Sequence, residues 1–272
     1  MVMWLPGKQY GLKSVSRWGY NNLIKGFGRI LVLPNFFAAE KRMEQVEQTA
    51  KRYKTISEST AFMVMLTLLS GYLNAYTYAT RGGIFANMHT GNMSKLGISL
   101  AGGNFAGSWQ YLAPILAAIL GVMFSELVRH RFSGIAFGSW QKNMLAFEIL
   151  VLVGAAFIAS GWHDMLIACV FSFVTEAQLS VFGKWEGKGH STTICTGNLR
   201  NLGQYLYPAI AVHDRESLRT AGLYFVMVFS FALGAVLGIW ACALLGTFGS
   251  IPAALGFVLL LGSILREEHT RA

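Results

Sequence analysis

The chain has 272 residues, of which 54% are hydrophobic and 13% are charged, and its formal net charge is +9. A soluble domain would carry about a quarter charged residues, so the composition argues against a soluble globular protein and predicts a polytopic membrane protein. Its three cysteines, Cys169, Cys195 and Cys242, form no disulfide framework and no paired metal-ligand spacing.

Residues 1–57 are predicted to be a basic cytoplasmic extension. Residues 1–35 contain five Lys or Arg and no acidic residue, and apolar residues such as Trp18 and Phe27 recur at helical spacing. A basic amphipathic stretch of this kind can lie on an anionic membrane surface. A solvated extension and a basic, acid-poor transit peptide are the alternatives. Residues 40–58 carry charges of both signs, which indicates a short polar helix or linker.

Six apolar segments follow, each close to the ~20 residues that a helix needs to cross a bilayer. They are expected to be helical, because lipid offers no hydrogen-bond partner to an unpaired backbone group. The predicted spans are 61–80, 109–128, 143–161, 163–182, 220–245 and 248–265. Only a few residues around Gly161 separate the third span from the fourth, which predicts a tight hairpin.

A short motif occurs twice in the chain. The first copy begins at His89 and reads HTGNMSKLG, and the second begins at Cys195 and reads CTGNLRNLG, so five letters coincide at an offset of 106 residues. The same offset brings the first three apolar segments close to the last three. We infer an internal duplication in a membrane domain at 58–266, with repeats at about residues 58–161 and 163–266 and a tail at 267–272.

The basic residues predict the orientation of the spans. With a cytoplasmic amino terminus, all but two of the 22 Lys and Arg residues lie on the cytoplasmic side, the exceptions being Arg81 and Lys95. This distribution follows the positive-inside rule and explains the net charge without a nucleic-acid partner. Three spans per repeat make the second repeat enter the membrane from the opposite side. The sequence therefore predicts an all-α membrane protein with six transmembrane helices in two inverted three-helix repeats.

The repeated Thr-Gly-Asn motif is expected to begin a re-entrant or interfacial helix in each repeat, with the threonine hydroxyl as N-cap. In one hypothesis, the two helix amino termini point to the midplane and bind an anion or a polar oxygen. The residues predicted to bind this solute are Thr90, Gly91, Asn92, Thr196, Gly197, Asn198 and Gln178. In the other hypothesis, the motif only caps helices and packs the two repeats together.

Polar residues inside the apolar spans are further candidates for a functional site, because such residues are costly in lipid and often functional. Glu176 lies inside the fourth span, near Gln178, and is a candidate for coupling to a proton or cation. A structural carboxyl satisfied by its neighbours is the alternative for Glu176. Glu126 lies one turn from Arg129, which indicates an ion pair at the membrane interface. His89 lacks the further ligands that a metal site needs, and no metal or cofactor is expected.

Glycines predict two local features. Gly82 and Gly83 follow the first span, where they permit a sharp turn. Gly234 and Gly238 lie four residues apart in the fifth span, a spacing that suits close helix packing. The sequence contains no P-loop, dinucleotide fingerprint or nucleophile-base-acid arrangement, so we do not expect an enzyme.

The segments on either side of the motif resemble those of one known family. They read SGYLNA from Ser70, GGIF from Gly82 and TGN from Thr90, then EAQ from Glu176, TT from Thr192 and TGN from Thr196. These segments are similar to the YoaK family of bacterial membrane proteins, over about residues 58–266. The resemblance implies a membrane location and the repeat, but no activity, because the family is a domain of unknown function. Two departures are Asn74, where members commonly carry an acidic residue, and the basic extension.

The leading hypothesis is a transporter or channel-like protein of the bacterial inner membrane, multi-pass with both termini cytoplasmic. It would pass a small polar or anionic solute between the repeats. The alternative is a non-transporting membrane subunit that binds a partner complex or cofactor through the basic extension. Membrane lipid, a protein partner or a second copy of the chain are the contacts that these hypotheses imply. An intramembrane enzyme is a third hypothesis.

Overall fold

The computed structural model describes residues 56–131, 137–182, 184–185, 188–189 and 195–271. The chain divides into two units, Met1–Arg52 and Tyr53–Ala272, and every described residue belongs to the second unit. The amphipathic stretch expected in the basic extension therefore lies outside the described residues.

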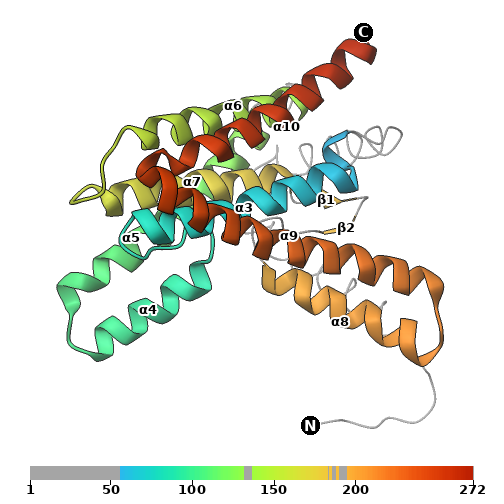
Figure 1. The fold of residues 1–272 in the computed structure, drawn as a ribbon, viewed down its shortest axis with the longest axis horizontal. Coiled ribbons are helices and arrows are strands. Elements are labelled where there is room, and N and C mark those ends of the chain that lie inside the picture. Colours follow the sequence, from blue (N-terminus) through green and yellow to red (C-terminus); the bar gives the residue numbers. More distant parts are fainter. Residues whose placement is uncertain (1–55, 132–136, 183, 186–187, 190–194, 272) are drawn as a thin grey trace, which may run out of the picture. The chain divides into compact units, whose positions relative to one another are not determined.

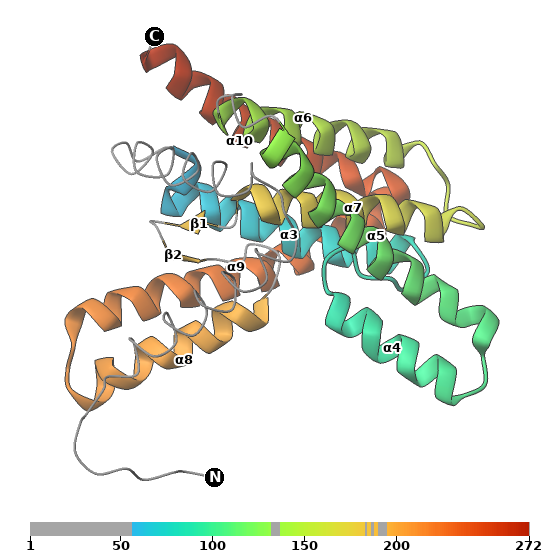
Figure 2. The same cartoon turned by 180° about the vertical axis from the view of Figure 1, so that it is seen from behind.

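Helices make up nearly all of the described chain (Figures 1 and 2). In chain order the α-helices are α3 (Thr60–Thr80), α4 (His89–Ala101), α5 (Phe105–Arg131), α6 (Phe137–Ala156), α7 (Asp164–Phe182), α8 (Cys195–Ala211), α9 (Arg215–Leu245) and α10 (Ser250–Arg271). The short elements are the 3₁₀ helices η1 (Ile56–Glu58) and η2 (Gly246–Gly249) and an antiparallel strand pair, β1 (Lys184–Trp185) with β2 (Lys188–Gly189). The all-α prediction is confirmed for this part of the chain.

The six predicted apolar segments coincide with helices α3, α5, α6, α7, α9 and α10. Within the described residues, three stretches are long and apolar enough to cross a membrane: Phe105–Arg131, Asp164–Phe182 and Arg215–Thr270. The last of these stretches contains both α9 and α10. The length and composition of these helices are consistent with a membrane protein.

Two local predictions have different outcomes. The ion pair expected between Glu126 and Arg129 is present near the end of α5. The tight hairpin expected at Gly161 is wrong, because α6 ends early and residues 157–163 form a longer loop. The carbonyl oxygens of Ala155, in the last turn of α6, and of Ile158, in this loop, accept hydrogen bonds from the Arg81 side chain, which stabilises the chain where it leaves the helix.

The helices pack in pairs that join distant parts of the chain. Helix α3 packs along α9, α5 packs along α7, and α6 packs beside α10. Helix α4 packs against α5, and α8 packs against α9, as Figures 1 and 2 show. Each short helix that carries a Thr-Gly-Asn motif therefore lies against the long helix that follows it.

Small residues set the closest of these contacts. A methyl group added to Gly234 of α9 would overlap the carbonyl oxygen of Leu68, and one added to Gly238 would overlap that of Tyr72. The predicted packing role of these two glycines is thus confirmed, and their partner is α3. Gly121 makes a similarly close approach from α5 to the backbone of α7.

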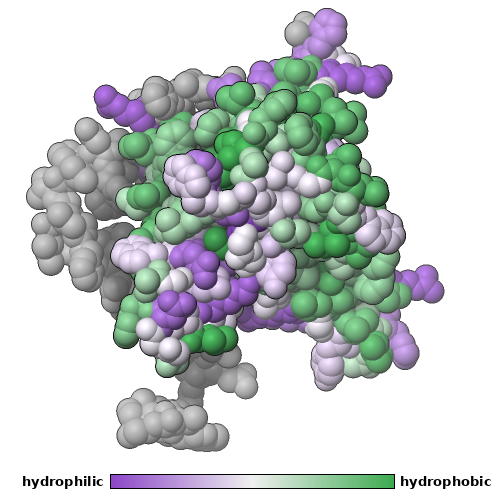
Figure 3. All heavy atoms as spheres, turned by 60° about the vertical axis from the view of Figure 1, so that its left-hand side comes forward, coloured by the Kyte–Doolittle hydropathy of each residue, from purple (hydrophilic) through white to green (hydrophobic). Residues whose placement is uncertain are grey.

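The core lies between α3, α6, α7 and α10, and its buried side chains include Leu66, Phe171 and Phe257. Large hydrophobic side chains such as Leu120 and Phe229 are also exposed on the outer faces of the helices. Figure 3 shows hydrophobic residues spread over much of one face. A soluble protein rarely exposes so much contiguous apolar surface, whereas a lipid-facing surface requires it.

The starts of α3 and α6 lie beside the ends of α7 and α10. The rings of Phe62 in α3 and Phe182 in α7 are 5.5 Å apart between centroids. Lys142 Nζ of α6 lies 2.6 Å from Glu268 Oε2 of α10. Neighbouring helices in this group therefore run in opposite directions.

Candidate functional site

The segment between α3 and α4 is partly buried without being helical. We call residues 81–88 the break. Gly82 and Gly83 have φ angles of 66° and 74°, in the left-handed region that glycine adopts at low cost, so the expected sharp turn is confirmed. Ile84 and Ala86, which follow, are almost fully buried. Buried backbone groups need hydrogen-bond partners, so polar side chains around the break are expected to supply them.

Asn92 of α4 provides both partners for the backbone of Phe85. Its Oδ1 accepts from the Phe85 amide at 3.1 Å, and its Nδ2 donates to the Phe85 carbonyl oxygen at 2.9 Å. The Asn92 side chain is fully buried. The amide group of Asn92 therefore hydrogen-bonds the backbone of the break. This supports the hypothesis that Asn92 has a packing role in the motif.

The next two residues of the break are held by α3 and α7. Thr77 of α3 accepts from the Ala86 amide at 3.0 Å, and Thr175 of α7 donates to the Ala86 carbonyl oxygen at 3.2 Å. Asn74 Oδ1 of α3 accepts from the Asn87 amide at 3.1 Å. Side chains from three helices therefore replace the hydrogen bonds that a continuous helix would have supplied.

Lys95 of α4 reaches back over the break. Its Nζ donates to the Gly83 carbonyl oxygen at 2.5 Å. The same nitrogen lies 4.4 Å from the ring centroid of Tyr78 and 4.6 Å from that of Phe85, and these two rings stack on each other. This cation–π arrangement fixes the ammonium group in place.

A helix begins at each copy of the Thr-Gly-Asn motif, but the threonines are not its N-caps. Helix α4 begins at His89 and α8 at Cys195, so Thr90 and Thr196 lie inside the first turn. The reason in α4 is that the Met88 carbonyl oxygen already accepts the first helical amide hydrogen bonds. Both threonine side chains are exposed.

The other motif residues differ in their surroundings. Gly91 lies beneath Phe85, where an added methyl group would come within 3.1 Å of the ring, whereas Gly197 has open space around it. Asn198, the counterpart of Asn92, is buried. Helices α4 and α8 pack on different partners and lie apart in Figures 1 and 2. The structure therefore does not bring the two copies of the motif into one packed pair.

Glu176 of α7 meets the start of α4 through His89. His89 Nε2 lies 3.4 Å from Glu176 Oε1, which is an ion-pair distance without hydrogen-bond alignment. The two side chains are mostly buried, with exposed fractions of 20% and 10%. A carboxylate near the first residue of α4 also suits the positive end of the helix dipole. The predicted coupling residue therefore lies beside one copy of the motif.

Several buried polar atoms in the break and in the helices that hold it lack a protein hydrogen-bond partner. In the part of the chain that the structure describes, they include Asn74 Nδ2, Asn87 Oδ1, Ser172 Oγ and the ring nitrogens of His89. Asn74 and Asn87 contact each other, and Ser172 precedes Glu176 by one turn on the same face of α7. Since most buried polar atoms are paired, this group requires an explanation. We call these five residues the break site.

Gln178 does not join the break site. Its Nε2 donates to Glu148 Oε2 of α6 at 2.7 Å. Glu176, only two residues earlier, contacts His89, because residues two apart on a helix point in different directions. The two polar residues of α7 that the sequence grouped together thus belong to separate contacts.

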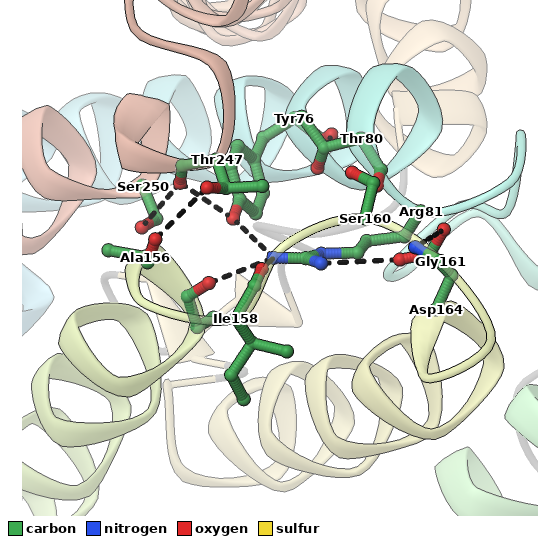
Figure 4. Close-up of polar contacts among 11 residues, drawn as sticks. Tyr76, Thr80, Arg81, Ala156, Ile158, Ser160, Gly161, Asp164, Thr247 and Ser250 are labelled. Atoms are coloured by element: carbon green, nitrogen blue, oxygen red, sulfur yellow. Dashed lines mark hydrogen bonds and ion pairs between the residues drawn. The ribbon is translucent and has the colours of Figure 1, made fainter.

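Arg81, which the sequence indicates only as a marker of topology, has a structural role. Its side chain is fully buried, and Nη2 donates to the carbonyl oxygens of Ala155 at 2.8 Å and Ile158 at 2.9 Å. Figure 4 shows the guanidinium group between Ile158 and Asp164. A cation is favourable at a helix carboxyl end, where unpaired carbonyl oxygens gather. A basic residue directly after an apolar run was the available clue.

Metal ligands do not gather in the described part of the chain, where no three His, Cys, Asp or Glu side chains lie together. The polar atoms of the break site are amide, hydroxyl, imidazole and carboxyl groups. Such a set can hydrogen-bond a small polar molecule and exchange a proton, but it contains too few strong ligands for a structural metal site.

A family model described as "Protein of unknown function (DUF1275)" matches residues 62–264. The chain belongs to this family. The match begins in α3 and ends in α10, so the DUF1275 domain includes the break, both Thr-Gly-Asn motifs and all residues of the break site. A search of curated proteins and a search of solved structures each found no match. Membership defines the domain and leaves its activity to be argued from the site.

Proposed function

We propose that this protein is a multi-pass transporter or channel-like protein of the bacterial inner membrane, and that a small polar solute passes through the break site. The observation that carries the proposal is the set of buried, unpartnered polar atoms in α3, the break and α7, together with the contact between His89 and Glu176. Polar groups inside a membrane protein are costly and often mark solute or proton paths. Interrupted helices recur at the binding sites of secondary transporters.

The packing partners support two inverted three-helix repeats. At the 106-residue offset α3 corresponds to α7 and α5 corresponds to α9. The observed contacts follow this correspondence: α3 packs on α9, and their counterparts α7 and α5 pack on each other. Helix α6 packs on its own counterpart, α10. A pseudo-two-fold axis between the repeats would produce this pattern.

The helix ends support six spans with both termini cytoplasmic. The starts of α3 and α6 lie beside the ends of α7 and α10, and the opposite ends of α3 and α6 meet at Arg81. In this topology Arg81 faces the outside, but it is buried and paired with Asp164. YoaK-like proteins carry the same DUF1275 domain, which supports the resemblance noted in the sequence.

The chemistry of the break site favours a neutral polar solute or a cation over the anion included in the sequence-based hypothesis. Glu176 would repel an anion whenever its carboxyl group is ionised. Asn87 Oδ1 offers an acceptor and Asn74 Nδ2 offers a donor, which suits a solute that has both kinds of group. The contact between His89 and Glu176 provides a place where a proton can be exchanged during passage.

A second function, that of a non-transporting membrane subunit, is favoured by one observation. The amide of Asn92 is used entirely within the chain, and both motif threonines lie on the surface, where a partner can reach them. In that case the break site would only stabilise the fold, and the basic extension would contact the partner complex.

Liposomes that contain the purified full-length protein can separate these functions. Stopped-flow light scattering after mixing with hypertonic urea, glycerol, erythritol or choline chloride reports whether the solute follows water into the vesicle. We expect permeation of at least one of these probes above that of protein-free vesicles, and its loss in Glu176→Gln. Ser263→Ala in α10 is the matched control and should retain permeation. If no probe permeates faster than through bare lipid, the transport proposal fails and the subunit function is favoured.

A further inference from the structure

Glu148 of α6 and Gln178 of α7 form a buried pair away from the break site. The two residues are only 2% and 1% exposed. Gln178 Nε2 donates to Glu148 Oε2 at 2.7 Å. The other oxygen of each side chain, Oε1 in both cases, is also buried and has no protein hydrogen-bond partner. One pair of side chains therefore contains one satisfied hydrogen bond and two unsatisfied oxygens.

Both unsatisfied atoms are acceptors when Glu148 is ionised, so neither can serve the other. A carboxylate has no donor, and the oxygen of an amide can only accept. One proton on Glu148 Oε1 removes this conflict, because the new O–H group can donate to Gln178 Oε1. A carboxylic acid and an amide can form a cyclic pair with two hydrogen bonds. The same proton removes a buried charge, whose burial without an opposite charge is costly.

We propose that Glu148 is a proton-binding site of the folded protein, held as a neutral carboxylic acid by Gln178. The ligand is a proton, and the two side chains of the pair form the whole site. The site is distinct from the break site, because Gln178 and Glu176 contact different helices. Its position in the core between α6 and α7 shields the proton from direct exchange with water.

The charged groups on the neighbouring elements are engaged elsewhere. On α7, Glu176 and Asp164 contact His89 and Arg81 respectively. On α6, Lys142 pairs with a glutamate of α10, and the charged residues of α10 all lie in its last two turns. Helix η2 carries no titratable side chain. In the described residues, Gln178 is the one side chain that hydrogen-bonds Glu148.

Infrared spectra of the full-length protein in lipid nanodiscs test the proposal directly, because the carbonyl stretch of a protonated carboxyl group is absent from a carboxylate. At neutral pH we expect a band from a buried carboxylic acid that disappears in Glu148→Gln. This variant keeps the shape of the pair and can form the corresponding amide–amide pair, so it should fold. In Gln178→Leu the band should move to higher frequency, because the hydrogen bonds are lost. Glu126→Gln, in an exposed ion pair, should leave the band unchanged.

The pH dependence of stability provides a second readout. A proton that the folded state holds and the unfolded state releases makes the protein less stable as pH rises. Between about pH 5 and about pH 8, above the ordinary pKa of an unfolded glutamate, the Tm of the wild type should fall relative to that of Glu148→Gln. Equal slopes for the two proteins would count against the proposal.

Two further results would overturn the proposal. One is a neutral-pH spectrum without a carboxylic acid band that depends on Glu148. The other is a wild-type Tm that rises when sodium chloride replaces choline chloride at constant ionic strength, with no rise in Glu148→Gln, which would place a metal cation between the two oxygens. Neither result bears on solute passage, because these measurements follow the state of Glu148 and not flux through the break site.

Discussion

Arg81 and Asp164 form a buried ion pair between the end of α3 and the start of α7, with Nη1 and Oδ1 3.2 Å apart. The arginine side chain is fully buried, whereas the aspartate side chain keeps 18% of its surface exposed. Asp164 Oδ2 also accepts from the Gly161 amide at 3.0 Å. Helices α3 and α7 are thus joined at one end by opposite charges, and the same carboxylate holds the loop before α7.

Asp164→Asn is expected to leave the guanidinium of Arg81 buried without a counter-charge. We expect the free energy of unfolding to fall by about 2–3 kcal/mol. This is no more than the smallest losses typical of a broken buried ion pair, about 3 kcal/mol, because Asp164 is partly exposed. Equilibrium unfolding in detergent micelles measures the change. Glu126→Gln breaks an exposed ion pair and should cost less than about 1 kcal/mol. Equal losses in the two variants would contradict the structural role of Arg81.

Asn92→Ala should destabilise the protein far more than Thr90→Ala, although the two residues belong to one motif. The first change leaves the amide and the carbonyl of Phe85 buried and unpaired, at a cost of about 2–4 kcal/mol. The second removes an exposed side chain and should change the free energy of unfolding by at most about 0.5 kcal/mol. The same unfolding assay compares them, and a larger loss in Thr90→Ala would contradict the assignment.

Gly234→Ala and Gly222→Ala, both in α9, are expected to have opposite effects. A methyl group at Gly234 overlaps the backbone of α3 at Leu68, so α9 must move away, and we expect a loss of about 1–3 kcal/mol. Gly222 has open space around it, and alanine there should stabilise the helix by about 0.5–1 kcal/mol. Thermal unfolding of the two variants in the same detergent measures the difference. Similar Tm values would mean that α3 and α9 are not in close contact.

Asp214 is the N-cap of α9, and this cap should weaken in acid. Hydrogen bonds from the Ser217 hydroxyl and the Glu216 amide lower the pKa of Asp214. A carboxylate with a lowered pKa stabilises the fold above its unfolded pKa of about 3.9, and the contribution disappears as pH falls through the lower, folded value. Hydrogen exchange of the first turn of α9 should therefore accelerate below about pH 4 in the wild type relative to Asp214→Asn, which caps at any pH. Identical profiles would exclude the cap.

The helices themselves were predictable, because each apolar run is long enough to define its own element. The six expected segments coincide with α3, α5, α6, α7, α9 and α10, and the stretches after Thr90 and Thr196 are helical as well. Gly82 and Gly83 were found for a similar local reason, since a sharp turn needs residues without a Cβ. These features depend on short pieces of sequence and need no knowledge of tertiary contacts.

The partners of the polar side chains were less predictable, because they depend on how distant helices meet. Nothing near Arg81 in the sequence indicates the carbonyl oxygens of Ala155 and Ile158. The two polar residues of α7, Glu176 and Gln178, looked like one site but point to different helices. The prediction that Thr90 and Thr196 are N-caps was wrong for a local reason. Each helix starts one residue before the threonine, which places the threonine in the first turn.

The hydrogen bond from Thr175 to the Ala86 carbonyl oxygen joins residues that are 89 positions apart. A ribosome makes the break long before it makes α7, so the Ala86 carbonyl oxygen lacks its Thr175 partner until the second half of the chain has been made. Until α7 has been made, water or another molecule has to supply a hydrogen bond to that oxygen. The first half of the chain is therefore an incomplete folding unit, and we expect a chain that stops at residue 161 to be degraded in a pulse-chase experiment while the full chain persists.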